Sequence, residues 1–172
     1  MSLTVSMVPY IQKLAAAVKS GKKSALDDLC FEIEYEQLTK DVWPQAVFEF
    51  FVSALHDTDI TSLTGARAFV LSLYNDFDKL TAEQRRVLLQ TFGAEADSFG
   101  DEMLRHAASD LVARKYPPAL AFDFFAELAG GGGPGGRHMA LVGLELLLLS
   151  GKLDKRQATF AEPLLAELIR KP

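Results

Sequence analysis

The sequence predicts an all-α fold of about nine helices, and two observations support this prediction. Apolar side chains recur at three- and four-residue steps along almost the whole chain, which is the period of an amphipathic helix. Sustained alternation of apolar and polar residues between hairpin turns, the sign of a strand, does not occur. Because 172 residues with 49% hydrophobic side chains can bury a core, we expect a single domain over residues 1–172.

The first helices are predicted from local signals near the N-terminus. Val8, Ile11 and Leu14 share one helical face, and this first helix should end before Ser20. A second helix is expected to start at Ser24, whose hydroxyl suits an N-cap, and to reach about residue 38. Pro44 should open the third helix, because proline is tolerated at the first helical position.

Periodicity predicts the remaining helices as well. They are expected over residues 63–77, 81–92, 101–115, 117–129, 137–149 and 154–170. Pro163 should break or kink the last of them. The glycine-rich segment 130–136 is expected to be a flexible loop. The most apolar window, residues 138–151, is too short for a membrane span and contains Glu145, so we expect a buried helix there. The apolar stretch after Lys13 is only residues 14–18 and lysines follow it, so we expect no signal peptide.

The chain also matches itself at a nearly constant offset. Pro44 and the segment 48–51 (FEFF) match Pro118 and the segment 122–125 (FDFF), 74 residues further on. Three more matches fall at offsets of 72 to 74: segments 27–29 with 101–103, 68–70 with 140–142, and 80–84 with 153–157. The shared offset predicts a tandem duplication, with an N-terminal helix in residues 1–23 and four-helix units at 24–97 and 98–172.

Each predicted unit would contain two helix pairs of about 37 residues, a typical period for helical solenoids. In pair length, in prolines near helix starts and in apolar stripes through both helices of a pair, the chain after Ser24 resembles HEAT-like helical repeats. This resemblance implies a stacked solenoid whose surface binds other macromolecules. The alternative is an irregular helical bundle. In both cases the segments 47–52 and 121–126 are apolar nearly all round, so their phenylalanines should be core rather than a ligand site.

Charge is distributed unevenly along the chain, whose formal net charge is −5. Residues 1–26 contain four lysines and no acid, whereas residues 27–59 contain nine carboxylates and one base, Lys40. A negative field repels phosphate backbones and attracts basic proteins or peptides, so we expect a basic partner and no nucleic acid. The basic region 13–23 lacks a helix-turn-helix pattern, which disfavours a transcription regulator.

The candidate partner-binding residues lie on the second predicted helix. Asp28, Glu32 and Glu36 follow one another at steps of four and form an acidic ridge, with Phe31 and Tyr35 as apolar anchors at its edge. Only Glu36 has a basic residue four positions further on, Lys40. The ridge is interpreted as a docking surface for a basic partner, and the alternative is an ordinary solvated helix face.

Catalytic signatures are weak. The glycine-rich segment lacks the Lys-Ser/Thr pair of a P-loop, although backbone amides and Arg137 could hold an anion. Glu102, His106 and Asp110 share a helix face and would be the residues of a metal-dependent hydrolase, the alternative function. His138 is expected to be a helix-start residue without a special role. Cys30 lies on an apolar face and should be a small buried hydrophobe.

We therefore predict a cytoplasmic, non-enzymatic protein-protein interaction module that needs no cofactor or metal and does not bind membranes. A single cysteine is compatible with a reducing compartment. The sharper hypothesis is an inhibitory decoy whose acidic surface occupies a basic partner, as small acidic immunity proteins do with nuclease toxins. That comparison is an analogy without a shared residue motif, and the sequence leaves the oligomeric state open.

Overall fold

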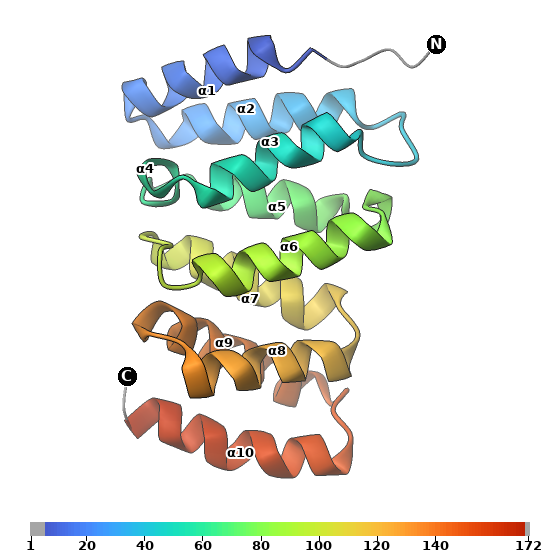
Figure 1. Ribbon diagram of the computed structural model, residues 1–172, viewed down its shortest axis with the longest axis vertical. Coiled ribbons are helices and arrows are strands. Elements are labelled where there is room, and N and C mark those ends of the chain that lie inside the picture. The colour runs from blue at the N-terminus through green and yellow to red at the C-terminus, as the bar shows by residue number, and fades with distance from the viewer. Residues whose placement is uncertain (1–5, 171–172) are drawn as a thin grey trace. The chain divides into compact units, whose positions relative to one another are not determined.

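The computed structural model describes residues 6–170, and over this range the fold is all-helical, as the sequence predicts (Figure 1). Ten α-helices and one short 3-10 helix occur in these residues, with no strand. The chain divides into two compact units, Met1–Thr91 (unit 1) and Phe92–Pro172 (unit 2). The outer ends of the predicted segments 1–23 and 98–172, at residues 1–5 and 171–172, lie outside the described range.

Unit 1 contains the helices up to the start of α6. They are α1 (Val8–Ser20), α2 (Lys23–Glu36), α3 (Gln45–His56), α4 (Thr58–Thr61), α5 (Arg67–Asn75), η1 (Phe77–Lys79) and α6 (Ala82–Glu95), which continues into unit 2. The helix predicted over residues 63–77 is shorter, and α4 was missed. The Asp57 side chain begins α4 by accepting hydrogen bonds from the Asp59 and Ile60 amides, so an N-cap was present in the sequence.

The connection between α1 and α2 corrects one predicted cap. Gly21 ends α1 in the left-handed region, at φ 63°, and donates its amide to the Val18 carbonyl. The next helix begins at Lys23, one residue before the predicted start, and no side chain caps it. In this turn the Ser20 hydroxyl, rather than the Ser24 hydroxyl, accepts a backbone hydrogen bond, which the Lys22 amide donates. Ser24 is therefore already inside the helix and is not its N-cap.

Aromatic rings form the core of unit 1. Within this unit α2 packs against α1 and α5, and α3 packs against α4 and α5 (Figure 1). Phe48 and Phe51 of α3 are fully buried, and the Phe51 ring meets Phe69 edge-on at 5.4 Å between centroids. Phe50 is also buried, which confirms the core predicted for residues 47–52.

A polar network holds the segment between α2 and α3 against this core. The indole Nε1 of the buried Trp43 donates to Asp76 Oδ2 at 2.8 Å, and Lys79 Nζ lies 3.1 Å from Asp76 Oδ1. Lys79 Nζ also donates to the Gln37 carbonyl, while Gln84 Nε2 donates to the Trp43 carbonyl at 3.3 Å. Buried polar groups need such partners, so this network fixes the entry into α3.

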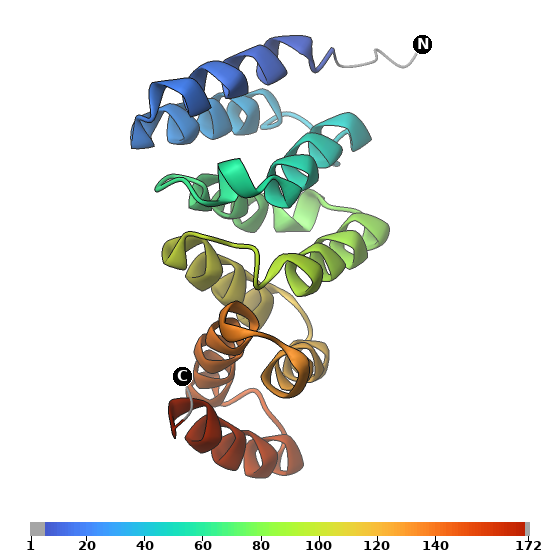
Figure 2. The same ribbon diagram turned by 60° about the vertical axis from the view of Figure 1, so that its left-hand side comes forward.

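In unit 2 the helix α9 is central. The helices are α7 (Glu102–Lys115), α8 (Pro118–Gly131), α9 (Pro134–Ser150) and α10 (Lys155–Arg170), and α9 packs against all three others (Figure 2). Phe125 is fully buried against Gly143, where a Cβ would lie 2.1 Å from the ring. The predicted core is wrong for Phe122 and Phe124, which are half-buried. Phe122 instead lines an open cleft, because α10 covers α8 only in part.

The glycine-rich segment is not the flexible loop that the sequence predicts. Helix α8 continues to Gly131 and α9 begins at Pro134, so two glycines alone connect them. The Asp97 carboxylate accepts hydrogen bonds from the Gly133 amide at 2.8 Å and the Gly136 amide at 2.9 Å, at the N-terminus of α9. A Cβ at Gly135 would lie 2.3 Å from the Ala96 carbonyl oxygen. A glycine is required at position 135 because two backbones approach closely there.

The segments 80–84 and 153–157, which match each other in sequence, adopt the same local motif. The Thr81 amide donates to the Gln84 side chain, and the Gln84 amide donates to Thr81 Oγ1. The Asp154 amide likewise donates to Gln157, whose own amide donates to Asp154 Oδ1 at 2.8 Å. Both are capping boxes, which satisfy two amides at a helix start. The duplication of a whole four-helix unit remains a prediction.

We predict that Gly135→Ala destabilises the protein by about 1–3 kcal/mol, because the new methyl group would overlap the Ala96 backbone. Gly130→Ala is the matched control: no atom lies within 4 Å of its added Cβ, and alanine is the better helix former, by about 0.5–1 kcal/mol. Urea unfolding of both variants measures the difference. Equal stability of the two variants would show that this close approach does not constrain the segment.

Candidate functional site

The predicted anchors on α2 form an exposed aromatic stripe. Phe31 is 70% exposed and Tyr35 is 66% exposed, one helical turn apart. Their rings stack on each other with centroids 6.5 Å apart and an interplanar angle of 28°. Leu38, two residues after the end of α2, is also exposed. We call Phe31, Tyr35 and Leu38 the α2 stripe. Large apolar side chains gathered in solvent mark candidate contact sites.

The acidic ridge is partly engaged by α1. Lys13 Nζ forms an ion pair with Glu32, and the Tyr10 hydroxyl donates to Glu36. The sequence suggests Lys40 as the partner of Glu36. In the structure the partner is Tyr10, which lies 26 positions before Glu36 in the chain. Asp28 is exposed and has no ion pair or hydrogen bond within residues 6–170. Of the three ridge carboxylates, Asp28 is the one that stays directed to solvent without a described partner.

Three other carboxylates of residues 27–59 lie away from the ridge, namely Glu34, Glu49 and Asp57. Glu49 and Asp57 line a groove of about 300 Å³ with Ile11 and Phe50, between α1, α3 and α4. Glu34 accepts a hydrogen bond from Asn75 Nδ2 of α5 at 3.2 Å. The acidic block is therefore spread over several faces of unit 1.

Glu102, His106 and Asp110, the residues predicted for the alternative hydrolase function, do not form one site. Asp110 accepts a hydrogen bond from Arg114 Nε at 2.6 Å, one turn further along α7. Glu102 and His106 are exposed at the start of that helix. Over residues 6–170, no group of three or more His, Cys, Asp or Glu side chains is arranged to hold a metal ion.

A basic cluster lies in unit 2, and of its residues the sequence singles out only Arg137 as a possible anion contact. Arg105 of α7 and Arg137 and His138 of α9 line a cavity of about 350 Å³, together with Asp97. Burial lowers the pKa of His138, and the neighbouring Arg105 lowers it further. His138 Nε2 lies 3.9 Å from Glu102 Oε1. Arg137 and His138 are adjacent in the chain, but Asp97 and Arg105 lie more than 30 residues earlier, so spacing along the chain carries no signal for the whole cluster.

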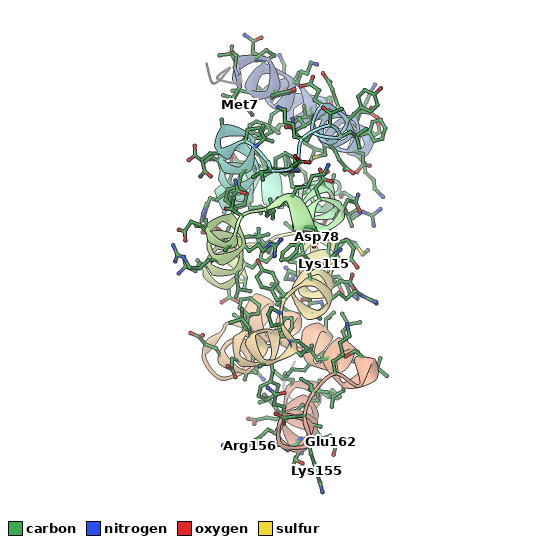
Figure 3. The ribbon with its side chains drawn as sticks, turned by 90° about the vertical axis from the view of Figure 1, so that its right-hand side faces the viewer. Met7, Asp78, Lys115, Lys155, Arg156 and Glu162 are labelled. Carbon is green, nitrogen blue, oxygen red and sulfur yellow. The ribbon has the colours of Figure 1, made fainter. Side chains whose placement is uncertain are left out.

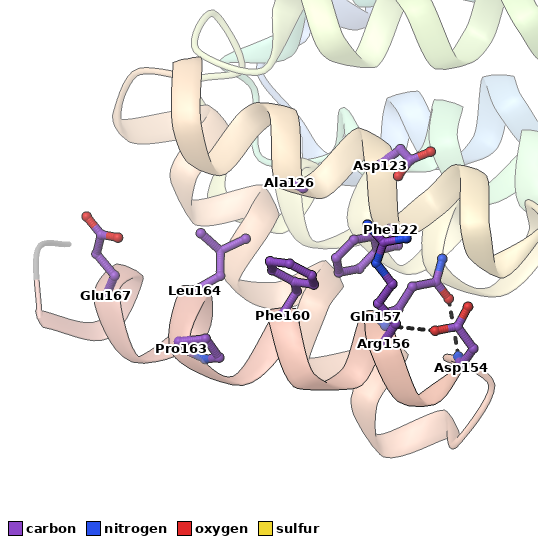
Figure 4. Close-up of a pocket in the computed structure, with 10 residues that line it drawn as sticks. All are labelled: Phe122, Asp123, Ala126, Asp154, Arg156, Gln157, Phe160, Pro163, Leu164 and Glu167. Atoms are coloured by element: carbon purple, nitrogen blue, oxygen red, sulfur yellow. Dashed lines mark hydrogen bonds between the residues drawn. The ribbon is translucent and has the colours of Figure 1, made fainter.

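A cleft with a volume of about 690 Å³ lies between α8 and α10. Figure 4 shows Phe122 of α8 and Phe160 of α10 facing each other across it. Asp123 and Glu167 lie at its rim. Lys155 and Glu162 of α10 are exposed to solvent and are labelled in Figure 3. The sequence missed this cleft because Phe122 was assigned to the core.

Cys30 has the environment of a packing residue. Its side chain is buried at 2% exposure, as the sequence predicts. Burial raises the pKa of the Cys30 thiol far above its ordinary value, and the negative charges of Asp27 and Glu34 raise it further. Since the thiolate is the nucleophilic form, this cysteine is unsuited to covalent catalysis.

Comparison with known proteins gives no match: no family model, no curated protein and no solved structure matches this chain. Among the helices of residues 6–170, none combines the length and apolar character needed to cross a membrane. The function is therefore inferred from the geometry of the chain itself.

We predict that Cys30 does not react with a thiol reagent in the folded protein at about pH 8, because the thiol is both buried and protonated. Absorbance of the released chromophore from a disulfide reagent measures the rate. Unfolding the protein in denaturant should expose the thiol and make the reaction complete within the mixing time. A fast reaction without denaturant would contradict the described burial.

Proposed function

We propose that this protein is a non-enzymatic interaction module that binds a basic protein or peptide through the α2 stripe and Asp28. The observation that carries the proposal is the stacked, solvent-exposed pair Phe31 and Tyr35. Aromatic side chains dominate the energetics of many protein interfaces, since they bury a large apolar area with few rotatable bonds. Burying this pair in a complex would remove apolar surface that folding leaves in water.

Charge supports a basic partner. The Asp28 carboxylate lies one turn before Glu32 on the same helix, and the chain carries a net charge of −5. A lysine or arginine of the partner can form an ion pair with Asp28 while its stem, or a guanidinium, packs on an aromatic ring. Charge complementarity of this kind mainly accelerates association and selects the partner.

Binding of a basic partner fits an inhibitory decoy of the immunity type, acting in the cytoplasm and built on HEAT-like helical repeats. The support is the acidic net charge, the all-helical fold and the exposed anchors. In this proposal, docking on α2 covers the basic functional surface of the partner. No comparable observation favours a metal-dependent hydrolase or a transcription regulator.

The test uses a labelled synthetic peptide of alternating leucine and lysine and a second peptide with glutamate in place of lysine. We expect saturable binding of the basic peptide, at least about tenfold stronger than binding of the acidic one. Raising the salt from about 50 mM to about 500 mM should weaken it. Phe31→Ser combined with Tyr35→Ser should reduce binding about tenfold or more, and Asp28→Lys should reduce it less. Fluorescence anisotropy measures all of these affinities.

Leu149→Ser is the matched control, because Leu149 is a 78% exposed apolar residue of unit 2. This variant should bind the basic peptide as the unmodified protein does. Circular dichroism melts establish that every variant is folded. Equal affinity for the two peptides, or full binding by the Phe31/Tyr35 double variant, would overturn the assignment of the α2 stripe.

A further inference from the structure

The basic cavity of unit 2 contains two polar atoms that lack a hydrogen-bond partner. Within residues 6–170, Arg105 Nε and His138 Nε2 are both buried and accept or donate no hydrogen bond. Buried donors are almost always satisfied in folded proteins, because leaving one unpaired costs free energy. Arg105 does donate from its Nη1 to the Phe99 carbonyl, so the guanidinium is held in place while its Nε stays unsatisfied.

The charges around the cavity favour an anion. Arg105 and Arg137 contribute two fixed positive charges, and Asp97 contributes one negative charge. The groups facing His138 are Arg105, Glu102 and His106 of α7, together with Arg137 and Asp97 at the cavity wall. The residues that line the cavity thus carry one net positive charge with His138 neutral and two with His138 protonated, while Glu102 lies outside the lining and its side chain is 72% exposed. Guanidinium groups bind phosphate and carboxylate oxygens through charge-assisted hydrogen bonds.

The N-terminus of α9 is not the binding element. Its Gly133 and Gly136 amides already donate to the two Asp97 oxygens. Each carboxylate oxygen can accept more than one hydrogen bond, so Asp97 can also accept from a ligand hydroxyl. On the other side, Leu141 and Leu168 provide an apolar wall. A cavity of about 350 Å³ is large enough for a phosphate group and a short organic portion.

We infer that this cavity binds a small hydroxylated phosphate monoester, with its phosphate held by Arg105 and Arg137 and a hydroxyl group donating to Asp97. His138 stands beside the phosphate and adds a hydrogen bond when it is protonated. Since a bound dianion favours the imidazolium, binding of an anion of constant charge strengthens as the pH falls. The inference concerns unit 2 and is independent of the α2 stripe.

The experiment titrates the full chain with inorganic phosphate, glycerol phosphate and lactate at about pH 7.5. Calorimetry and amide chemical shifts measure the binding. We expect saturable binding of glycerol phosphate in the millimolar range or tighter, with inorganic phosphate weaker and lactate weakest. Arg105→Gln should weaken binding about tenfold. Arg156→Gln, at an exposed arginine outside this cavity, is the matched control and should bind normally.

A second arm measures sulfate affinity between about pH 5.5 and 7.5, because sulfate keeps its two charges over this range. Binding should strengthen about tenfold toward low pH in the unmodified protein, and His138→Asn should remove this dependence. If Arg105→Gln does not fold, Arg137→Gln replaces it with the same expected loss. Absence of saturable binding, undiminished binding by the arginine variant, or lactate binding tighter than glycerol phosphate would each overturn the inference.

Discussion

The Asp97 carboxylate at the N-terminus of α9 is the contact on which the organisation of unit 2 depends. Its two oxygens satisfy the Gly133 and Gly136 amides, which would otherwise be unpaired at a helix start. The contact is short because no side chain separates the Gly135 backbone from Ala96. It therefore sets where α9 begins and how closely that helix approaches the segment after α6. The same helix then packs against α7, α8 and α10, so the constraint extends through the unit.

One consequence of this contact concerns the surface. By occupying the amides of α9, Asp97 removes the helix end as an anion site and also places a carboxylate beside Arg105 and His138. The cavity there is thus basic but contains one acid, which suits a ligand with both an anionic group and a hydroxyl. In the α8–α10 cleft, by contrast, aromatic side chains meet, and none of the described residues that line it has a buried polar atom without a hydrogen-bond partner. The two hollows of unit 2 consequently differ in what they can recognise.

In unit 1 the candidate interface is the face of α2 that the packing of this helix leaves exposed. The α2 helix buries Leu26, Leu29 and Ile33 between α1 and α5, which leaves its remaining face to solvent. On that face Phe31 and Tyr35 stack on each other, and no other helix of unit 1 covers them. Packing against α1 simultaneously engages Glu32 and Glu36 with Lys13 and Tyr10. The candidate surface that results is more aromatic and less acidic than the spacing of charges along the chain indicates.

The sequence by itself determined the helical class, most helix positions, the buried aromatic core of α3 and the burial of Cys30, since these follow from periodicity and local caps. It also located the exposed Phe31 and Tyr35, because a helical period separates them from the apolar face of α2. Only the tertiary structure decided that residues 130–136 are largely helical, that Phe122 lines a cleft, and that Arg105, Arg137 and His138 share a cavity. The physical reason is that these features depend on contacts between segments distant in the chain, such as Asp97 with Gly133, and no local period encodes such contacts.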